Sequence, residues 1–427
     1  MMTTLTTETF YDHAKMPWAG EIRFPSTRTF SQYSHRIYNR YPARSINLVP
    51  RAIIKSLEPV RKGSLCVLDP FMGSGTTAVE ATLAQCEPFG VEIDPFARLI
   101  SDVRVRYYGN AVFEKLLSQY SAICKKWPTY KPDIRLTPKL NNVSHWFNEI
   151  QFIDLLKLKN AIYEITCGDS LCRDFFRVVL ADVIRPCSLA ERQTLKPYIS
   201  TKYIKNPADV ISTFNKSFLI HLDAARAFDQ AAGPVRPEKI TWLGSDATSY
   251  VAEACSIDVA ITSPPYLNAL DYVRCIKIES AWVDCGNDSS FQTIRKTQVG
   301  DPSRGRSEAV THVEEILGDI CGEIALTDKD RSRTILGYFS DMFQNLVCTF
   351  KVLKPFTSYH LIVGDSVIRG ISVPTHEIIA KLGQEIGFEW TNYYRYPIRD
   401  HRTSIPRHNN GGKIMSEHVV SLRKPRS

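Results

Sequence analysis

The chain has 427 residues, of which 44% are hydrophobic and 23% are charged, and these values are ordinary for a globular protein with one large core or two average ones. Its formal net charge of +8 suits a polyanionic partner, although a modest basic excess does not demonstrate one. No apolar run reaches the length of a membrane span, and the N-terminus lacks a signal-peptide pattern. These features predict a cytoplasmic protein without a membrane partner.

Cysteine and histidine are dispersed along the whole chain. The eleven cysteines occur singly, without a C-x-x-C pair, and the ten histidines do not cluster. Unpatterned cysteines are typical of reduced thiols in the cytosol. Without ligands at metal-binding spacing, the sequence predicts no metal site.

The N-terminal part reads as the start of an α/β sheet. Residues 1–40 are polar and aromatic and are expected to be irregular. Apolar residues at helical spacing predict a helix over 46–60. The short apolar runs 64–70 and 88–94 predict two strands, and the small residues of 76–86 predict the helix between them. This strand–helix–strand pattern is typical of a doubly wound sheet.

The middle of the chain is mainly amphipathic helix. Residues 109–237 are therefore interpreted as a helical insertion, and the sheet is expected to resume with strands at 239–246 and 257–263. A polar, basic stretch at 295–308 is predicted to be a mobile loop. Further elements are predicted at 335–353 (helix), 358–366 (strand), 374–386 (helix) and 417–424 (strand). One α/β domain, formed by 1–108 and 238–427, is thus interrupted by the insertion.

The stretch "VLDPFMGSGTTAVEA" (67–81) has the features of a ligand-binding loop. A strand ends at Asp69, a loop with Gly73 and Gly75 follows, and a helix starts at Thr76. Glycines let the backbone approach a ligand, and the helix start offers free N–H groups. The loop lacks the G-x-x-x-x-G-K-[ST] pattern, which argues against a nucleoside triphosphate. A dinucleotide stays open, since Ala78 is a tolerated variant of the third glycine.

Two carboxylates follow later predicted strands. Glu92 in "GVEIDP" stands where doubly wound folds bind ribose hydroxyls. Asp246 in "WLGSDA" ends another strand and could accept a hydrogen bond from an adenine amino group. Together with Asp69 they place three acids at strand ends around one glycine loop, which favours a ligand site over three unrelated helix caps.

These motifs resemble those of a known family. "DPFMGSGTT" followed by "GVEIDP", "GSDA" and "TSPPY" is similar to the S-adenosylmethionine-dependent amino methyltransferases of DNA. The resemblance extends to "YPARSINLVPRAII" (41–54), which in that family lies beside the methionine moiety, and to 338–366 and 409–424. It covers about two thirds of the chain and implies a mostly parallel, seven-stranded, Rossmann-like methyltransferase sheet.

The resemblance also implies roles for individual residues. Glu92 would hold the ribose of S-adenosylmethionine and Asp246 its adenine, while Phe71 serves equally well as a core residue. The residues implied around the methionine end are Asp69, Pro70, Phe71, Gly73, Gly75 and Thr76.

The turn Ser263-Pro264-Pro265-Tyr266 would carry the catalysis. An exocyclic amine is a poor nucleophile because its lone pair is delocalised, and two acceptors on its protons counteract this. The Ser263 hydroxyl and the Pro264 carbonyl are such a pair, and the two prolines stiffen the turn. Tyr266 would stack on a base extruded from the duplex.

The predicted activity is methylation of the N4 amine of cytosine in double-stranded DNA. In the resembling family, a serine before Pro-Pro is similar to the motif of the N4-cytosine enzymes. An acidic or amide residue at that position usually accompanies methylation of adenine. N6-adenine methylation, RNA guanine-N2 methylation and a non-catalytic DNA-binding role are the alternatives. Such a restriction–modification enzyme implies a separate cognate endonuclease and a prokaryotic or phage origin. DNA contacts are expected from 109–237, 295–308 and 395–413.

Overall fold

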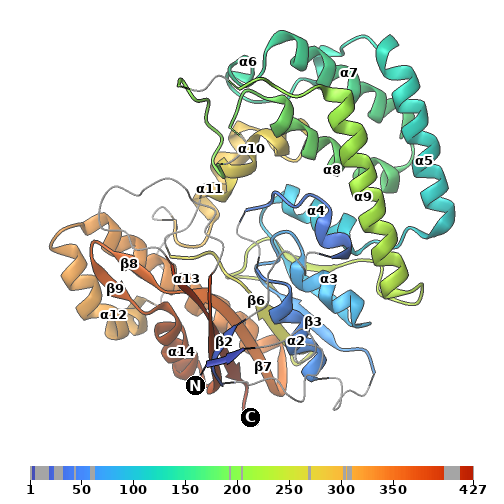
Figure 1. The fold of residues 1–427 in the computed structure, drawn as a ribbon. Coiled ribbons are helices and arrows are strands. Elements are labelled where there is room, and N and C mark those ends of the chain that lie inside the picture. The colour runs from blue at the N-terminus through green and yellow to red at the C-terminus, as the bar shows by residue number, and fades with distance from the viewer. Residues whose placement is uncertain are drawn as a thin grey trace.

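A nine-stranded sheet forms the centre of the computed structural model (Figure 1), with the strand order β1-β2-β10-β11-β7-β6-β3-β4-β5. The structure describes residues 2–4, 19–23, 32–42, 45–57, 63–191, 194–202, 205–267, 271–301, 304, 310–398 and 414–426. The strands of this sheet are β1 (Met2–Thr4), β2 (Ala19–Arg23), β3 (Cys66–Asp69), β4 (Glu87–Val91), β5 (Thr241–Gly244), β6 (Ile257–Thr262), β7 (Leu353–Gly364), β10 (Glu389–Pro397) and β11 (Ser416–Arg423).

The seven strands from β5 to β10 form the predicted Rossmann-like sheet, which is thereby confirmed. Strands β7, β6, β3, β4 and β5 are mutually parallel, and β11 runs antiparallel between β7 and β10. Strands β1 and β2 extend the sheet at the β10 edge. The expectation that residues 1–40 are irregular was therefore wrong for these two strands. Strand β2 pairs with β10, which lies far along the chain, and β1 pairs with β2, so these strands form through contacts that are not local in sequence.

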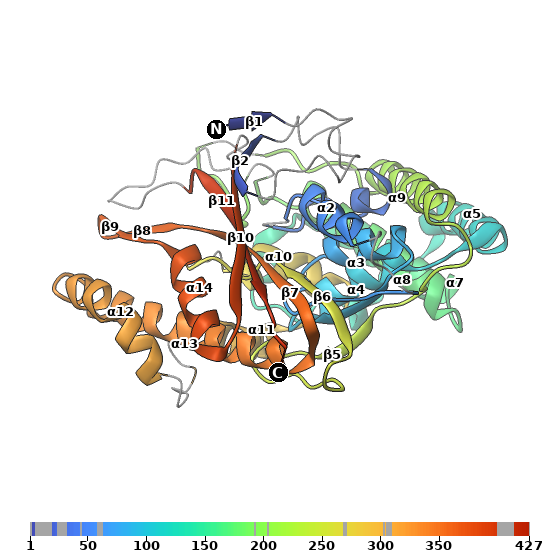
Figure 2. The ribbon, with the colours of Figure 1, turned by 90° about the horizontal axis from the view of Figure 1, so that it is seen from below.

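Helices cover both faces of the sheet, as a doubly wound fold requires (Figure 2). Apolar residues of α2 (Leu48–Ser56) and α3 (Thr76–Leu83) share one buried cluster with one face. Those of α13 (Lys329–Val352) and α14 (Thr375–Ile386) share another with the opposite face. Four of the six residues of β6 are apolar and fully buried, which is typical of a strand covered on both sides.

The helices between the two halves of the sheet gather at one end of the molecule (Figure 1). Their shared core also includes residues of α4, before the insertion, and of α10, after it, so the helical block is continuous with the sheet domain. The helices of this region are α4 (Pro95–Val105), α5 (Gly109–Lys126), α6 (Val143–Trp146), α7 (Glu149–Ile165), α8 (Ser170–Cys187), α9 (Val210–Ala232) and α10 (Tyr272–Trp282). No helix in the described ranges is long and apolar enough to cross a bilayer.

Several elements were not predicted. Besides α4 and α10, they include α11 (Asp288–Thr297), α12 (Val310–Ala325), the hairpin β8 (Ser366–Ile368) with β9 (Ile371–Val373), and the 3-10 turns Tyr33–Arg36, Trp127–Thr129 and Ile134–Leu136. The predicted loop 295–308 begins as the last turn of α11, and its residues 302–303 and 305–308 lie outside the described residues. In the described part of the chain, no disulfide joins any of the cysteines.

Candidate active site

The glycine loop joins the carboxyl end of β3 to the start of α3. Asp69 closes β3, and its carboxylate accepts hydrogen bonds from the Phe71 backbone N–H at 3.0 Å and from the Thr262 hydroxyl at 2.5 Å. Gly73 and Gly75 adopt φ values of +52° and +82°, in the left-handed region that favours glycine. The loop is thus fixed to the neighbouring strand β6, and its backbone turns back over the sheet edge.

Glu92, directly after β4, holds this loop from the other side. One of its carboxylate oxygens accepts from the Gly73 N–H at 2.6 Å and the other from the Asp94 N–H at 2.8 Å. Asp94 in turn caps α4 by accepting from the Phe96 N–H at 2.8 Å. These contacts bring two acids against the glycine loop and use both oxygens of Glu92.

Asp69 and Asp94 are buried and Glu92 is partly buried, and burial raises the pKa of all three. The pKa reaches about 6 for Asp69, about 7 for Glu92 and about 6 for Asp94. For Glu92 the nearby Asp94 carboxylate adds to the effect. Clustered carboxylates with little solvation create a negative potential at this edge of the sheet. A ligand that carries positive charge would relieve this repulsion.

Asp246, the third predicted strand-end acid, is bound to an arginine. It lies two residues beyond β5, and Arg304 Nη2 donates to its two oxygens at 2.9 and 3.1 Å. Burial opposes its ionisation, but bonds from Thr248 and the Arg304 charge outweigh burial and hold the pKa of Asp246 below its usual value. Arg304, from the predicted DNA-binding loop, therefore points toward the pocket in this structure.

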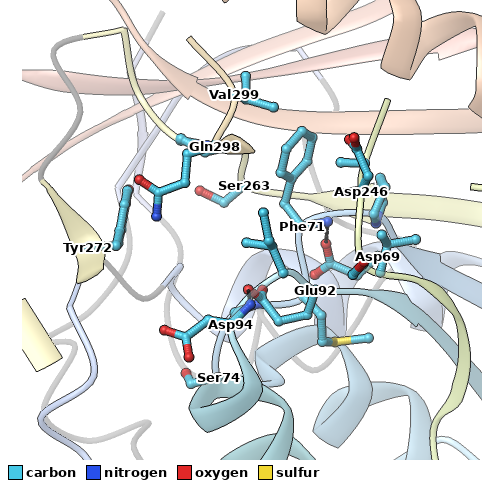
Figure 3. Close-up of a pocket in the computed structure, with 18 of the residues that line it drawn as sticks. Asp69, Phe71, Ser74, Glu92, Asp94, Asp246, Ser263, Tyr272, Gln298 and Val299 are labelled. Atoms are coloured by element: carbon cyan, nitrogen blue, oxygen red, sulfur yellow. Dashed lines mark hydrogen bonds between the residues drawn. The ribbon is translucent and has the colours of Figure 1, made fainter. Parts of the chain in front are cut away.

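The Ser-Pro-Pro-Tyr turn follows β6 directly, beside Asp69 (Figure 3). Ser263 and Pro265 line the pocket, whereas Pro264 is buried and Tyr266 is half-buried behind the turn. The Tyr266 hydroxyl donates to the Glu417 carboxylate of β11. Burial, followed by the Glu417 charge, raises the pKa of Tyr266. The Tyr266 ring is thus anchored to a strand 151 residues further along the chain.

One pocket joins the glycine loop, the strand-end acids and the turn. The predicted site residues that line it are Asp69, Pro70, Phe71, Gly73, Thr76, Glu92, Asp246, Ser263 and Pro265; those that do not are Gly75, Pro264 and Tyr266. The segment 41–54, expected beside the cofactor, contributes Tyr41, Pro42 and Ser45. Lining residues not assigned from sequence include Asp94, Tyr272, Gln298 and Arg304. Only Asp94, within the quoted "GVEIDP", carried a local signal.

A second polar cluster lies beyond β7. His376 Nδ1 is 2.7 Å from an Asp365 oxygen, and His418 Nδ1 is 2.7 Å from the Tyr393 hydroxyl. The two imidazole rings stack with centroids 4.1 Å apart and an interplanar angle of 17°. Because a metal ion lies in the plane of each imidazole that binds it, these two rings do not converge on one ion.

The conformation of Gly75 yields a stability prediction. A Cβ atom there would lie 2.9 Å from the Ser101 Cβ of α4, at a φ of +82°. We expect Gly75→Ala to lower the free energy of unfolding by about 2 kcal/mol through overpacking and backbone strain. Gly73→Ala is the control, since its Cβ would make only ordinary contacts, with Tyr41 Cε1 at 3.6 Å and the Phe71 carbonyl oxygen at 3.9 Å. Urea denaturation should show the larger loss for Gly75→Ala; equal losses would contradict the packing argument.

The raised pKa of Glu92 predicts a pH-dependent effect on stability. Its folded-state pKa of about 7 exceeds the value of 4.5 taken for an unperturbed glutamate. Between these values the folded state binds more protons, so the stability contribution of Glu92 falls as pH rises. Glu92→Gln removes this dependence. The melting temperature of the variant relative to the wild type should therefore rise by a few degrees from pH 5.5 to 8.5, and a constant difference would refute the assignment.

A doubly wound sheet with a glycine loop and acids at the carboxyl ends of its strands defines a Rossmann-like methyltransferase fold. No protein-family model matches the chain. The chain is similar to the Type II methyltransferase M.MvaI of Kocuria varians, with 23% identity over 426 residues, covering 94% of this chain and 91% of the relative. It is also similar to the Type II methyltransferase M.AvaI of Nostoc sp. (21% identity, covering 95% and 89%).

Type II methyltransferase M.BsoBI of Geobacillus stearothermophilus is 20% identical and aligns over 84% of this chain and 80% of its own length. Among solved structures, a SAM-dependent methyltransferase of Methanosarcina mazei aligns over 87% of this chain and 98% of its own, with 8% identity and a TM-score of 0.34. The nearly full-length sequence matches confirm the predicted resemblance to restriction–modification methyltransferases. The chain is a methyltransferase.

Proposed function

We propose that the chain is a site-specific DNA methyltransferase that transfers a methyl group from S-adenosylmethionine to the N4 amine of cytosine in duplex DNA. The observation that carries this proposal is the position of Ser263 on the wall of the acid-lined pocket, directly beside the glycine loop. The names of the Type II relatives support a methyltransferase of restriction–modification type. The choice of cytosine rests on serine at position 263.

The pocket suits S-adenosylmethionine in charge and in shape. Asp69, Glu92 and Asp94 favour a cationic ligand, and Gly73, which has no side chain, lets a ligand approach the loop closely. Glu92 would accept hydrogen bonds from the ribose, and Asp246 from the adenine amino group. The methionine end would lie along Pro70, Phe71, Gly73 and Thr76, while Gly75 would shape the loop behind them. When bound, S-adenosylmethionine supplies an electrophilic methyl group next to the turn.

The turn would activate the target amine. The Ser263 hydroxyl and the Pro264 carbonyl would accept the two amine protons and so free the nitrogen lone pair. The turn would thereby present the nitrogen to the methyl group of bound S-adenosylmethionine, and the proton that the amine loses would leave to solvent. Tyr266, anchored on Glu417, would offer its ring to the extruded base. Catalysis of this kind is mainly positioning.

The helical region 109–237 is proposed to contribute DNA recognition, together with basic residues near the pocket. Basic side chains there would neutralise phosphates without choosing the sequence. Most of the C-terminal basic stretch 395–413 lies outside the described residues, which end at 398 and resume at 414.

Incubation of the purified protein with labelled S-adenosylmethionine and plasmid DNA, followed by mass spectrometry of the nucleosides, tests this proposal. N4-methylcytosine is the expected product. N6-methyladenine would replace the cytosine assignment by the adenine one. Absence of label from the DNA would refute DNA methylation.

A further inference from the structure

The pocket has a second end, away from Asp246, that the cofactor residues do not account for. Tyr272 and Gln298 line this end, and Ser263 lies between them and Asp246 in the view of Figure 3. Tyr272 is the first residue of α10, and Gln298 follows the last residue of α11. Both come from the segment that continues from the Ser-Pro-Pro-Tyr turn.

Both side chains have unused hydrogen-bonding groups. Within the described part of the chain, only backbone atoms of Gln298 form hydrogen bonds, and no hydrogen bond of the Tyr272 hydroxyl is present. A glutamine amide carries both donor and acceptor atoms, and a tyrosine ring offers an apolar face. This combination suits a planar heterocycle with polar edges, because the ring can stack while the amide binds an edge.

The two residues are held by a rigid pair of helices. The Asp271 carboxylate caps α10 by accepting from the Arg274 N–H at 3.0 Å, and it pairs with Arg295 of α11 at 3.3 Å. Phe291 of α11 is buried in one apolar cluster with Val273 of α10. Tyr272 and Gln298 are therefore preorganised, which lowers the entropy lost when a ligand binds.

We propose that Tyr272 and Gln298 form the subsite for the extruded pyrimidine. The Tyr272 ring stacks on the base, and the Gln298 amide donates to its N3 and O2 edge while Ser263 accepts from the amine. This inference rests on the proposed function and adds to it a base-binding wall distinct from Tyr266.

Single substitutions test the subsite in methylation assays on plasmid DNA. Tyr272→Ala and Gln298→Ala should each lower kcat/KM for DNA about tenfold, the typical loss of one stacked or hydrogen-bonded base contact. Tyr272→Phe keeps the ring and should stay near wild type. Gln292→Ala is the matched control, since Gln292 is exposed on the same helix α11. The dissociation constant of S-adenosylmethionine should not change in any variant.

Binding to two duplexes separates base contact from a structural role. One duplex carries the site methylated by the wild type, and the other has an abasic position in place of the target base. Tyr272→Ala should weaken binding to the first duplex about tenfold and leave binding to the second unchanged. Equal losses on both duplexes, or none on either, would overturn the subsite. A wild type that methylates no DNA would instead refute the proposed function.

Discussion

Ser263→Ala should lower kcat for DNA methylation about 100- to 1,000-fold, the usual cost of removing one polar group that acts on the transition state. The hydroxyl stands at the end of β6 on the pocket wall, where alanine offers no acceptor for an amine proton. The acids that would hold the cofactor are untouched, because they stand at or beyond the ends of three other strands, β3, β4 and β5. The expected signature is therefore a loss in kcat with an unchanged dissociation constant for S-adenosylmethionine, measured by single-turnover kinetics and calorimetry.

Ser256→Ala provides the matched control for this variant. Ser256 lies immediately before the same strand, at its opposite end, where its hydroxyl donates to the Glu253 carbonyl at 2.7 Å. Its replacement should leave kcat within about twofold of wild type, well below the effect of losing a transition-state contact. If Ser263→Ala keeps more than a tenth of the wild-type kcat, the serine does not activate the amine.

The sequence predicted the parts of the site that are local motifs at strand ends. Asp69, Glu92, Asp246 and Ser263 each stand at or just beyond the carboxyl end of a short strand, and these strands are parallel. Parallel neighbours bring their carboxyl ends to one edge of the sheet. The four local motifs could therefore be assigned to one pocket from the sequence alone, without any knowledge of side-chain packing.

The remaining parts depend on contacts between distant segments. Tyr266 is bound by Glu417, and Asp246 by Arg304, 58 residues away. Tyr272 and Gln298 reach the pocket because α10 and α11 pack on each other, and no periodicity in the sequence fixes that angle. The helices α11 and α12 were missed for a different reason: they flank the polar stretch 295–308, which was interpreted as a loop.

Glu92→Gln should raise the dissociation constant of S-adenosylmethionine about 100-fold, the cost of losing charge-assisted hydrogen bonds in a buried site. Both Glu92 oxygens already accept backbone N–H groups, from Gly73 and Asp94. A glutamine has one acceptor oxygen, so its NH₂ group would face one of these donors. The glycine loop would lose a support at the same time as the ribose loses its carboxylate. Isothermal titration calorimetry measures the loss.

Glu87→Gln is the control for this change, since Glu87 is exposed at the start of the same strand β4. This variant should bind the cofactor with the affinity of the wild type. Comparison with S-adenosylhomocysteine, which has the same ribose but no sulfonium charge, identifies which interaction causes the loss of affinity in Glu92→Gln. Equal losses for both ligands indicate the ribose contact, and a larger loss for S-adenosylmethionine indicates the charge. An unchanged affinity would contradict both. The same substitution also removes a partly buried carboxylate, whose ionisation at high pH costs stability. The stability of the variant relative to the wild type should therefore be greater at high pH than at low pH, although the variant binds the ligand more weakly. Glu92 thus trades stability of the free protein for affinity toward a cationic ligand.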